Sequence, residues 1–335
     1  MKFNSIFITG GGGYVGSRLV PQLLAKGYKV TVYDIFYYTK KYLPKENNNF
    51  KIIEGDIRDI QNLKKSSLNH DIFLNLSCIS NDASFELDEK LSKSVNFDAF
   101  EPMVKAAKSS GIKRFIYASS SSVYGLSDQK DVKEDHPLVP LTLYNKFKGL
   151  CEPILFENTS NDFEGVVFRP ATVCGYAPRQ RFDLSVNILT NHAINKKQIT
   201  VFGGNQLRPN LHIKDYCDAV EVLSNSPSEK IKNEIFNIGY QNMSIREISL
   251  TVKKVVENEF EDLSPIPIKT VESNDNRSYH INSDKIHNIL GFKPQLTVED
   301  AVRELCYQFK KGIFTDPLSN EIYFNIKRMK NIEAK

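Results

Sequence analysis

The sequence lacks an apolar run of membrane-spanning length, and it lacks the basic and apolar leader of a secretory signal. Dense basic blocks are also absent. Lys and Arg number 44 against 40 Asp and Glu, which gives a formal net charge of +4 at pH 7. This mild excess suits an anionic small ligand and does not indicate nucleic-acid binding. We therefore expect a cytoplasmic protein without a membrane or nucleic-acid partner.

The five cysteines form no C-x-x-C pair, and the six histidines show no H-x-x-x-H spacing. An odd number of scattered cysteines favours neither a disulfide framework nor a zinc site, so no metal is predicted. The cysteines are interpreted as small, partly buried residues, with a catalytic thiol left open. The chain has 335 residues, of which 41% are hydrophobic. That length allows one large domain or two closely joined ones.

A glycine-rich turn near the start of the chain is the most informative pattern present. An apolar run over residues 6–9 is followed by Gly10, Gly13 and Gly16 at G-x-x-G-x-x-G spacing, and then by a helical pattern over 17–26. These glycines permit a tight turn, a close approach to a pyrophosphate and packing of helix against strand. The N-terminus of the helix stabilises anionic oxygens. The turn alone is equally typical of a plain loop.

Asp34 ends a second predicted strand, residues 30–33, about 20 residues beyond the glycines. A carboxylate at that place accepts hydrogen bonds from an adenosine ribose. The alternative is a cap or turn residue. Asp56 follows a third predicted strand, residues 50–54, and either binds the adenine amino group or caps the next helix. Strand, glycine turn, helix and acid together predict a dinucleotide site.

Further strand patterns alternate with helical ones, at residues 71–76, 115–118, 166–169 and 235–238. This predicts an α/β fold with a doubly wound parallel sheet (Rossmann), whose ligands gather at the carboxyl ends of the strands. Residues 79–86 are expected to form a loop near the substrate, and 89–110 a helix. We expect an NAD-binding domain over 1–170 and 211–240, and a smaller, discontinuous α/β substrate domain over 171–210 and 241–315. Residues 316–335 are expected to be a mobile tail or an arm across a partner.

Tyr144 and Lys148 form a Y-x-x-x-K pattern about 20 residues beyond four serines that end a strand, 119–122. Residues four apart share one helical face. A nearby ammonium favours the phenolate and lowers the pKa of the tyrosine. Tyr144 can then remove a hydroxyl proton while hydride leaves the same carbon, with a serine hydroxyl holding the oxygen. Taken singly, these patterns are typical of exposed helical pairs and of turns.

The order of glycine turn, serine-rich strand end and Y-x-x-x-K resembles the extended short-chain dehydrogenase/reductase family, in particular its NAD-dependent sugar-nucleotide epimerases and dehydratases. The resemblance continues through G-D-I-R-D, F-R-P-A-T-V-C-G and R-P-N-L-H-I-K-D. It implies that Tyr144 is the acid/base, that Lys148 binds the nicotinamide ribose and that Ser120 is the active-site hydroxyl. The implied cofactor is NAD, since no arginine adjoins Asp34, although Lys40 and Lys41 leave NADP open.

The resemblance also implies two sets of binding residues. For the cofactor these are Gly10, Gly13, Tyr14, Val15, Gly16, Asp34, Asp56, Ile57, Leu76, Ser77, Tyr144 and Lys148. For a nucleotide-diphosphate sugar they are Ser80, Asn81, Ser120, Thr172, Asn187, Arg208 and Arg277. Thr172 stands where the family often has asparagine. Arg208 and Arg277 resemble arginines that pair with the diphosphate, a group that suits the guanidinium fork. The alternative for each arginine is a surface charge.

The serines also bear on the reaction. Family dehydratases have Thr-Asp-Glu before V-Y-G, whereas this chain has Ser120, Ser121 and Ser122, which supply no carboxylate. The leading hypothesis is therefore epimerisation at C4 through a transient 4-keto sugar. The alternatives are a reductase or dehydrogenase with net hydride transfer and, less favoured, a 4,6-dehydratase; a non-catalytic cofactor-binding protein is a remote one. Helices over 96–110 and 143–156 resemble the family's dimer bundle, so a homodimer is expected. Polysaccharide precursors are the family's usual setting.

Overall fold

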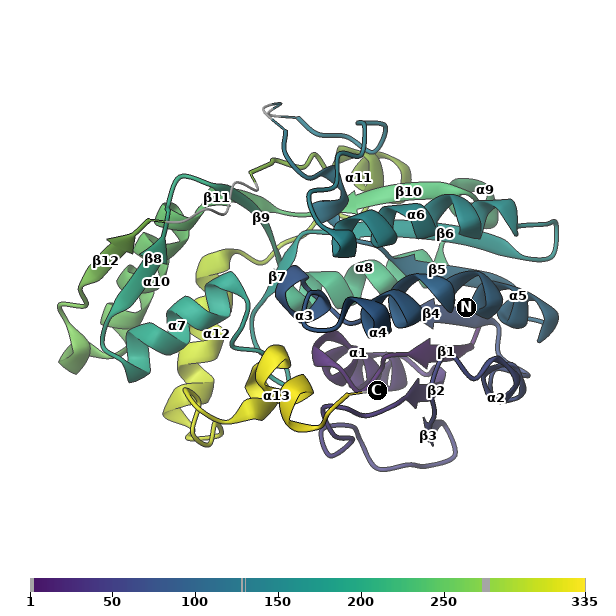
Figure 1. Ribbon diagram of the computed structural model, residues 1–335, viewed down its shortest axis with the longest axis horizontal. Coiled ribbons are helices and arrows are strands. Elements are labelled where there is room, and N and C mark those ends of the chain that lie inside the picture. Colours follow the sequence, from purple (N-terminus) through teal and green to yellow (C-terminus); the bar gives the residue numbers. More distant parts are fainter. Residues whose placement is uncertain (1–2, 128, 130, 273–277, 335) are drawn as a thin grey trace.

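The computed structural model describes residues 3–127, 129, 131–272 and 278–334. Its centre is a seven-stranded parallel sheet in the order β10-β6-β5-β4-β1-β2-β3 (Figure 1). The order reverses between β1 and β4, which confirms the predicted doubly wound fold. The strands are β1 (Ser5–Thr9), β2 (Lys29–Asp34), β3 (Phe50–Glu54), β4 (Ile72–Asn75), β5 (Arg114–Ala118), β6 (Glu164–Pro170) and β10 (Glu234–Ile238).

Helices cover both faces of this sheet because its strands are apolar on both sides. Ile6 and Ile8 of β1 pack in one core with residues of α1 (Tyr14–Ala25) and α8 (Ile213–Asn225). Phe7, between them, points to the opposite core. That core contains residues of α2 (Ile60–Ser66), α5 (Phe100–Ser109) and α6 (Leu143–Glu157). The alternation along β1 therefore fixes which helices lie on which face.

The second half of the chain builds a separate core beside the sheet, at the left of Figure 1. Its strands form a three-stranded sheet, β11-β9-β7, and a two-stranded one, β12-β8. These are β7 (Thr172–Cys174), β8 (Ile199–Phe202), β9 (Leu207–His212), β11 (Gln241–Ser244) and β12 (Ile268–Val271). The helices here are α7 (Ser185–Asn195), α10 (Ile245–Glu259), η3 (Glu261–Leu263) and α12 (Val298–Lys310), while α9 (Ser228–Ile231) and α11 (Asp284–Leu290) lie by β10.

Two predicted segments differ from the structure. A loop was expected over 79–86, but this prediction is wrong for residues Asp82–Phe85, which form the short helix α3. The side chain of Asn81 caps the first turn of this helix. The single helix expected over 89–110 is a succession of α4 (Glu89–Lys93), the π-helical η1 (Ser94–Asp98) and α5. A short helix begun by a side-chain cap carries no apolar periodicity of its own, so the sequence pattern did not reveal it.

The end of the chain is folded against the rest of the molecule. It forms η4 (Glu321–Tyr323) and α13 (Asn325–Asn331), drawn in yellow in Figure 1. The backbone N–H of Asn325 donates to Asp183 at 2.9 Å, and Arg328 Nε donates to the Tyr37 carbonyl at 2.7 Å. Residues 316–334 therefore do not form a mobile tail, whereas the alternative of an arm across a partner stays a prediction.

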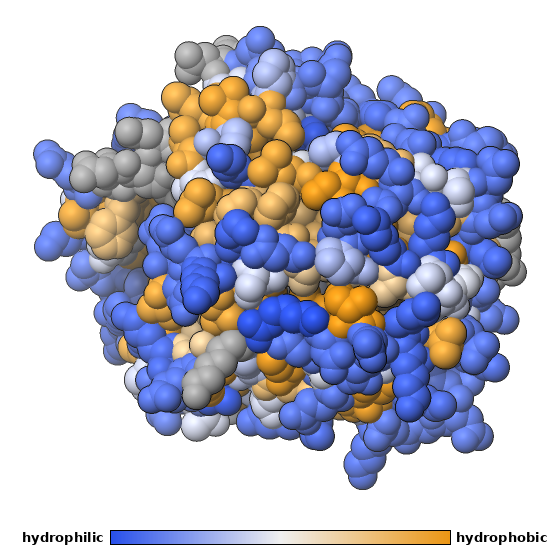
Figure 2. Space-filling view, turned by 45° about the vertical axis from the view of Figure 1, so that its right-hand side comes forward, coloured by the Kyte–Doolittle hydropathy of each residue, from blue (hydrophilic) through white to orange (hydrophobic). Residues whose placement is uncertain are grey.

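The described surface is mostly polar, with apolar residues gathered over part of one face (Figure 2). Large exposed apolar side chains recur between residues 126 and 150, namely Leu126, Leu138, Val139, Leu141, Leu143 and Leu150. In the ranges that the structure covers, no helix combines the length and apolarity needed to cross a membrane.

Candidate active site

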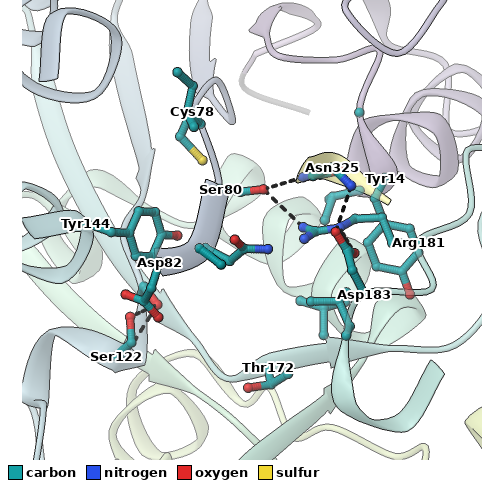
Figure 3. Close-up of a pocket in the computed structure, with 18 of the residues that line it drawn as sticks. Tyr14, Cys78, Ser80, Asp82, Ser122, Tyr144, Thr172, Arg181, Asp183 and Asn325 are labelled. Carbon is teal, nitrogen blue, oxygen red and sulfur yellow. Dashed lines mark hydrogen bonds and ion pairs between the residues drawn. The ribbon is translucent and has the colours of Figure 1, made fainter. Parts of the chain in front are cut away.

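A cavity of about 1210 Å³ opens at the carboxyl ends of β1, β2, β4 and β5 and extends toward the second core. It brings together all twelve residues predicted to bind the cofactor. Five of the residues predicted on the substrate side line the same cavity, namely Ser80, Asn81, Ser120, Thr172 and Arg208. Figure 3 shows several of them around one open space.

The glycine turn closes one end of this cavity. Gly10 has a φ of +75°, and a Cβ there would lie 2.5 Å from the Ser77 backbone nitrogen. A Cβ on Gly16 would lie 2.2 Å from the Gly11 carbonyl oxygen, so both positions exclude a side chain. Helix α1 begins after Gly13, and no described side chain caps its first turn. The free N–H groups of that turn therefore face the cavity as an anion-binding end.

Two carboxylates stand at the ends of β2 and β3. Asp34 accepts hydrogen bonds from the backbone N–H groups of Gly12 at 2.9 Å and Phe36 at 2.7 Å. Burial nevertheless raises its pKa. For Asp56 burial acts in the same direction, but hydrogen bonds from Arg58 outweigh it and lower the pKa. Ile57, next to Asp56, is buried at the cavity wall.

The three predicted catalytic residues come from the turn that follows β5 and from α6. Ser120 caps the 3₁₀ turn η2 (Ser121–Tyr124), and its Oγ lies 2.7 Å from Ser122 Oγ. Tyr144 and Lys148 are one turn apart on α6 and both line the cavity. Lys148 is 4% exposed, and its Nζ donates to the Ala118 carbonyl at 2.8 Å. The end of β5 thus fixes the ammonium beside the serine turn.

The pKa of Tyr144 contradicts the prediction made for it. Burial raises this pKa well above 10, and the neighbouring Cys78 and Asp82 raise it further. A hydrogen bond with the Asn81 backbone acts in the opposite direction. The prediction that Lys148 lowers the pKa is wrong for this structure, because burial and nearby negative charge dominate.

A buried ion pair links α6 to the ends of β5 and β6. Arg169 Nη2 donates to Glu152 Oε2 at 2.6 Å, and both side chains are 3% exposed. Ser119 Oγ donates to Glu152 Oε1 at 2.6 Å, and Arg169 also donates to the Tyr124 hydroxyl at 2.7 Å. This network ties α6 to β5, η2 and β6, and so holds the elements that carry Ser120 and Tyr144.

The remaining substrate-side residues lie in different places. Thr172 of β7 and Arg208 of β9 line the cavity, and Arg208 Nη1 donates to the Leu207 carbonyl at 2.9 Å. Asn187 does not line it. Its fully buried side chain accepts from the Gly175 N–H and donates to Tyr14 Oη, which positions the Tyr14 ring at the cavity wall. Arg277 lies outside the described residues.

Two arginines that the sequence analysis missed are buried in the cavity wall. Arg179 is 1% exposed and Arg181 is 7% exposed. Among the described residues, neither Arg179 Nε nor Arg181 Nη2 has a hydrogen-bond partner. Arg181 Nη1 donates to Ser80 Oγ at 3.1 Å, and Arg179 Nη2 donates to Asn325 Oδ1 at 2.6 Å. Buried guanidinium groups with unused donors indicate an anionic ligand.

The only sequence signal for this pair is the P-R-Q-R segment, which belongs to none of the motifs named above. No sequence pattern pointed to Asn325, because it contacts Ser80, a residue 245 positions away in the sequence. Asp82 was also missed. It lines the cavity on α3, where a loop was expected.

Comparison with known proteins gives a consistent family assignment. The model of the "NAD dependent epimerase/dehydratase family" matches residues 6–239. A UDP-N-acetyl-alpha-D-glucosaminuronate decarboxylase of Bacillus cytotoxicus is 27% identical, over 91% of this chain and 97% of that protein. A UDP-glucose 4-epimerase of Rhizobium meliloti is 25% identical, over 88% and 94%. The crystal structure of a dTDP-glucose 4,6-dehydratase from Streptomyces venezuelae with NAD bound superposes with a TM-score of 0.82 at 20% identity, over 94% of this chain and 100% of that one.

Proposed function

Because the chain belongs to the NAD-dependent epimerase/dehydratase family, we propose that it binds NAD and converts a nucleotide-diphosphate sugar into its C4 epimer. One observation carries this proposal. The same cavity holds a glycine turn without room for side chains and, beside it, Ser120, Tyr144 and Lys148. This arrangement would bring a dinucleotide and a proton-transfer group to one place.

The residues present fit NAD. The first turn of α1 offers free N–H groups to a diphosphate, and Gly10 and Gly16 keep the approach clear. Asp34 stands where it accepts from ribose hydroxyls, and Asp56 and Ile57 line the expected adenine end. Arg179 lies against α1, since its backbone N–H donates to Ser17 Oγ at 3.1 Å. Its buried, partly unused guanidinium suits the same diphosphate.

The chain's own residues would then manage the protons. As the phenolate, Tyr144 would take the proton of the sugar's C4 hydroxyl and return it, while Ser120 holds the same oxygen through a hydrogen bond. Because burial raises the pKa of Tyr144, this role requires the positive charges of the nicotinamide ring and Lys148 to favour the phenolate when NAD is bound. Lys148, fixed by Ala118, is placed to bind a ribose hydroxyl. Bound NAD supplies the hydride acceptor for C4 and the donor for its return. Epimerisation requires the 4-keto sugar to present its other face before the hydride returns.

The nucleotide-diphosphate part of the substrate is assigned to the second-core side of the cavity. Arg208 reaches it from β9, and Thr172 from the adjacent β7. Arg181 adds a second guanidinium, which is oriented by Asp183 at 2.8 Å. Bidentate arginines match a diphosphate.

Two other reactions of the family differ from epimerisation in the side chains they need or in the fate of the hydride. Dehydration needs an additional acid and base, but Ser121 and Ser122 stand where family dehydratases carry carboxylates. A dehydrogenase or reductase would use the same three catalytic residues with net hydride transfer, so only its stoichiometry distinguishes it from an epimerase.

We further propose a homodimer through α6. Leu143 and Leu150 on this helix are 38% and 41% exposed, and the half-buried Phe147 and Ile154 complete a stripe at alternating spacings of four and three. Such a stripe matches a helix-packing seam. Sedimentation of the purified chain should give a dimer, and Leu150→Glu should give a monomer. A monomeric wild type would contradict this proposal.

The function is tested by incubating the protein with UDP-glucose or UDP-galactose and following the products by chromatography and absorbance at 340 nm. We expect interconversion at constant mass without accumulation of NADH. Tyr144→Phe should stop it. Loss of one water from the sugar, or stoichiometric NADH, would exclude the epimerase.

A further inference from the structure

Asp82 is a carboxylate in the sugar end of the cavity that the mechanism does not use. It is the first residue of α3 and lines the cavity. Figure 3 shows it beside Tyr144. The ring of Phe85, from the same short helix, meets the Tyr144 ring edge-on at a centroid distance of 6.4 Å. Helix α3 therefore packs directly against the reactive tyrosine.

The position of this carboxylate is fixed relative to Tyr144. Thr142, the residue that caps α6, donates its hydroxyl to Asp82 Oδ1 and accepts from the Asn145 N–H. On the other side, Asn81 has a φ of +73°, which is unusual for a residue with a side chain, and its Oδ1 accepts from the Ser84 N–H. A strained residue persists where its surroundings determine it. Asp82 is thus held by the helix that carries the catalytic tyrosine.

The charge of Asp82 acts at the place where the sugar reacts. Together with Cys78 it raises the pKa of Tyr144 beyond what burial does. Lys148 donates to Ala118 and Arg181 pairs with Asp183, although the charge of Arg181 also acts on Tyr144 and lowers its pKa. Beside Tyr144, Asp82 thus presents a hydrogen-bond acceptor whose negative charge disfavours an anion placed directly against it.

We propose that Asp82 determines which sugars are accepted: it accepts a hydrogen bond from a hydroxyl adjacent to the reacting carbon and disfavours sugars with a carboxylate there. This inference rests on the proposed function, in which Tyr144 contacts the oxygen on C4. In a neutral hexose the two carbons bonded to C4 are C3, which carries a hydroxyl, and C5, which carries the C6 hydroxymethyl group. In a uronic acid C6 is a carboxylate, which would meet Asp82 as a like charge. The substrate class is therefore a neutral hexose rather than a uronate.

The test compares UDP-glucose with UDP-glucuronate. For the wild type, kcat/KM should favour UDP-glucose by roughly tenfold or more, because like charges at a binding site are strongly unfavourable. Asp82→Asn should reduce this preference at least about tenfold, mainly through a lower KM for UDP-glucuronate. Asp82→Glu should retain it. Glu89→Gln removes one exposed charge from the neighbouring α4 and should leave the ratio unchanged.

A wild type that prefers UDP-glucuronate, or an unchanged ratio in Asp82→Asn, would overturn the proposal. Dissociation constants measured by calorimetry separate it from the reaction itself. If neither sugar is epimerised but UDP-glucose binds more tightly and Asp82→Asn removes that difference, the proposed reaction fails and the role of Asp82 stands. If Asp82→Asn does not fold, Asp82→Ser serves as a second neutral variant.

Discussion

Replacing Glu152 by glutamine should destabilise the protein strongly although the side chain keeps its shape. The carboxylate accepts from Ser119 and Arg169 Nε on Oε1, at 2.6 and 3.0 Å, and from Arg169 Nη2 on Oε2 at 2.6 Å. Glutamine retains one acceptor oxygen, but its amide group then faces the guanidinium as donor against donor. Arg169, 3% exposed, would also lose its counter-charge. Removing one partner of a buried pair costs about 3–5 kcal/mol, and we expect about 3 because the other acceptors of Arg169 remain.

Urea unfolding of Glu152→Gln and wild type at pH 7 measures this loss. The matched control is Glu157→Gln, an exposed glutamate at the end of the same helix, which should change the free energy of unfolding by less than about 0.5 kcal/mol. Adding Arg169→Met to Glu152→Gln should cost less than the sum of the single changes, because it removes the uncompensated charge. A loss below about 1 kcal/mol for Glu152→Gln would refute the assignment of this pair as the support of the strand ends.

Three further predictions concern the site and its setting. Tyr144→Phe should lower kcat by about 10²- to 10⁴-fold with an unchanged melting temperature, and near-normal turnover would remove Tyr144 as the acid/base. Gly10→Ala and Gly111→Ala both place a side chain at positive φ, +75° and +91°, but only at Gly10 does the new Cβ meet backbone, at 2.5 Å. In thermal unfolding Gly10→Ala should therefore be the more destabilised of the two, and equal losses would contradict the crowding at the turn. Burial alone would raise the pKa of Glu304, but contacts with His212, the Tyr176 N–H and Arg18 lower it below 4.5. A lowered carboxyl pKa stabilises the fold above the unfolded value and loses that contribution as the pH falls through the folded value. Wild type should thus lose more stability than Glu304→Gln between pH 6 and pH 3, and parallel losses would show that Glu304 does not contribute.

The sheet and the catalytic helix were predictable because their signals are local. Each buried strand is a short apolar run in the sequence. The glycine turn directly follows the first strand, and Y-x-x-x-K lies within one helix. Alternation of strands with helices then fixed the parallel sheet, whose carboxyl ends bring Gly10, Asp34 and Ser120 together without further information.

The parts that were not predicted depend on contacts between distant segments. Arg179 and Arg181 matter because the chain buries them beside Ser80 and Asn325, which are far from them in the sequence. The raised pKa of Tyr144 depends on burial and on Asp82, neither of which a four-residue spacing reveals. Asn187 was assigned from the resemblance, but the structure uses its amide to hold Tyr14 and Gly175.

The central claim is that hydride leaves C4 of the sugar and returns to the same carbon within one turnover. UDP-glucose carrying deuterium at C4 tests this directly, with the product analysed by mass spectrometry and proton NMR. The account predicts UDP-galactose that retains the deuterium at C4, with no NADH accumulated and no NAD consumed. Loss of the label to solvent, its transfer to another carbon or a product lighter by one water would contradict it.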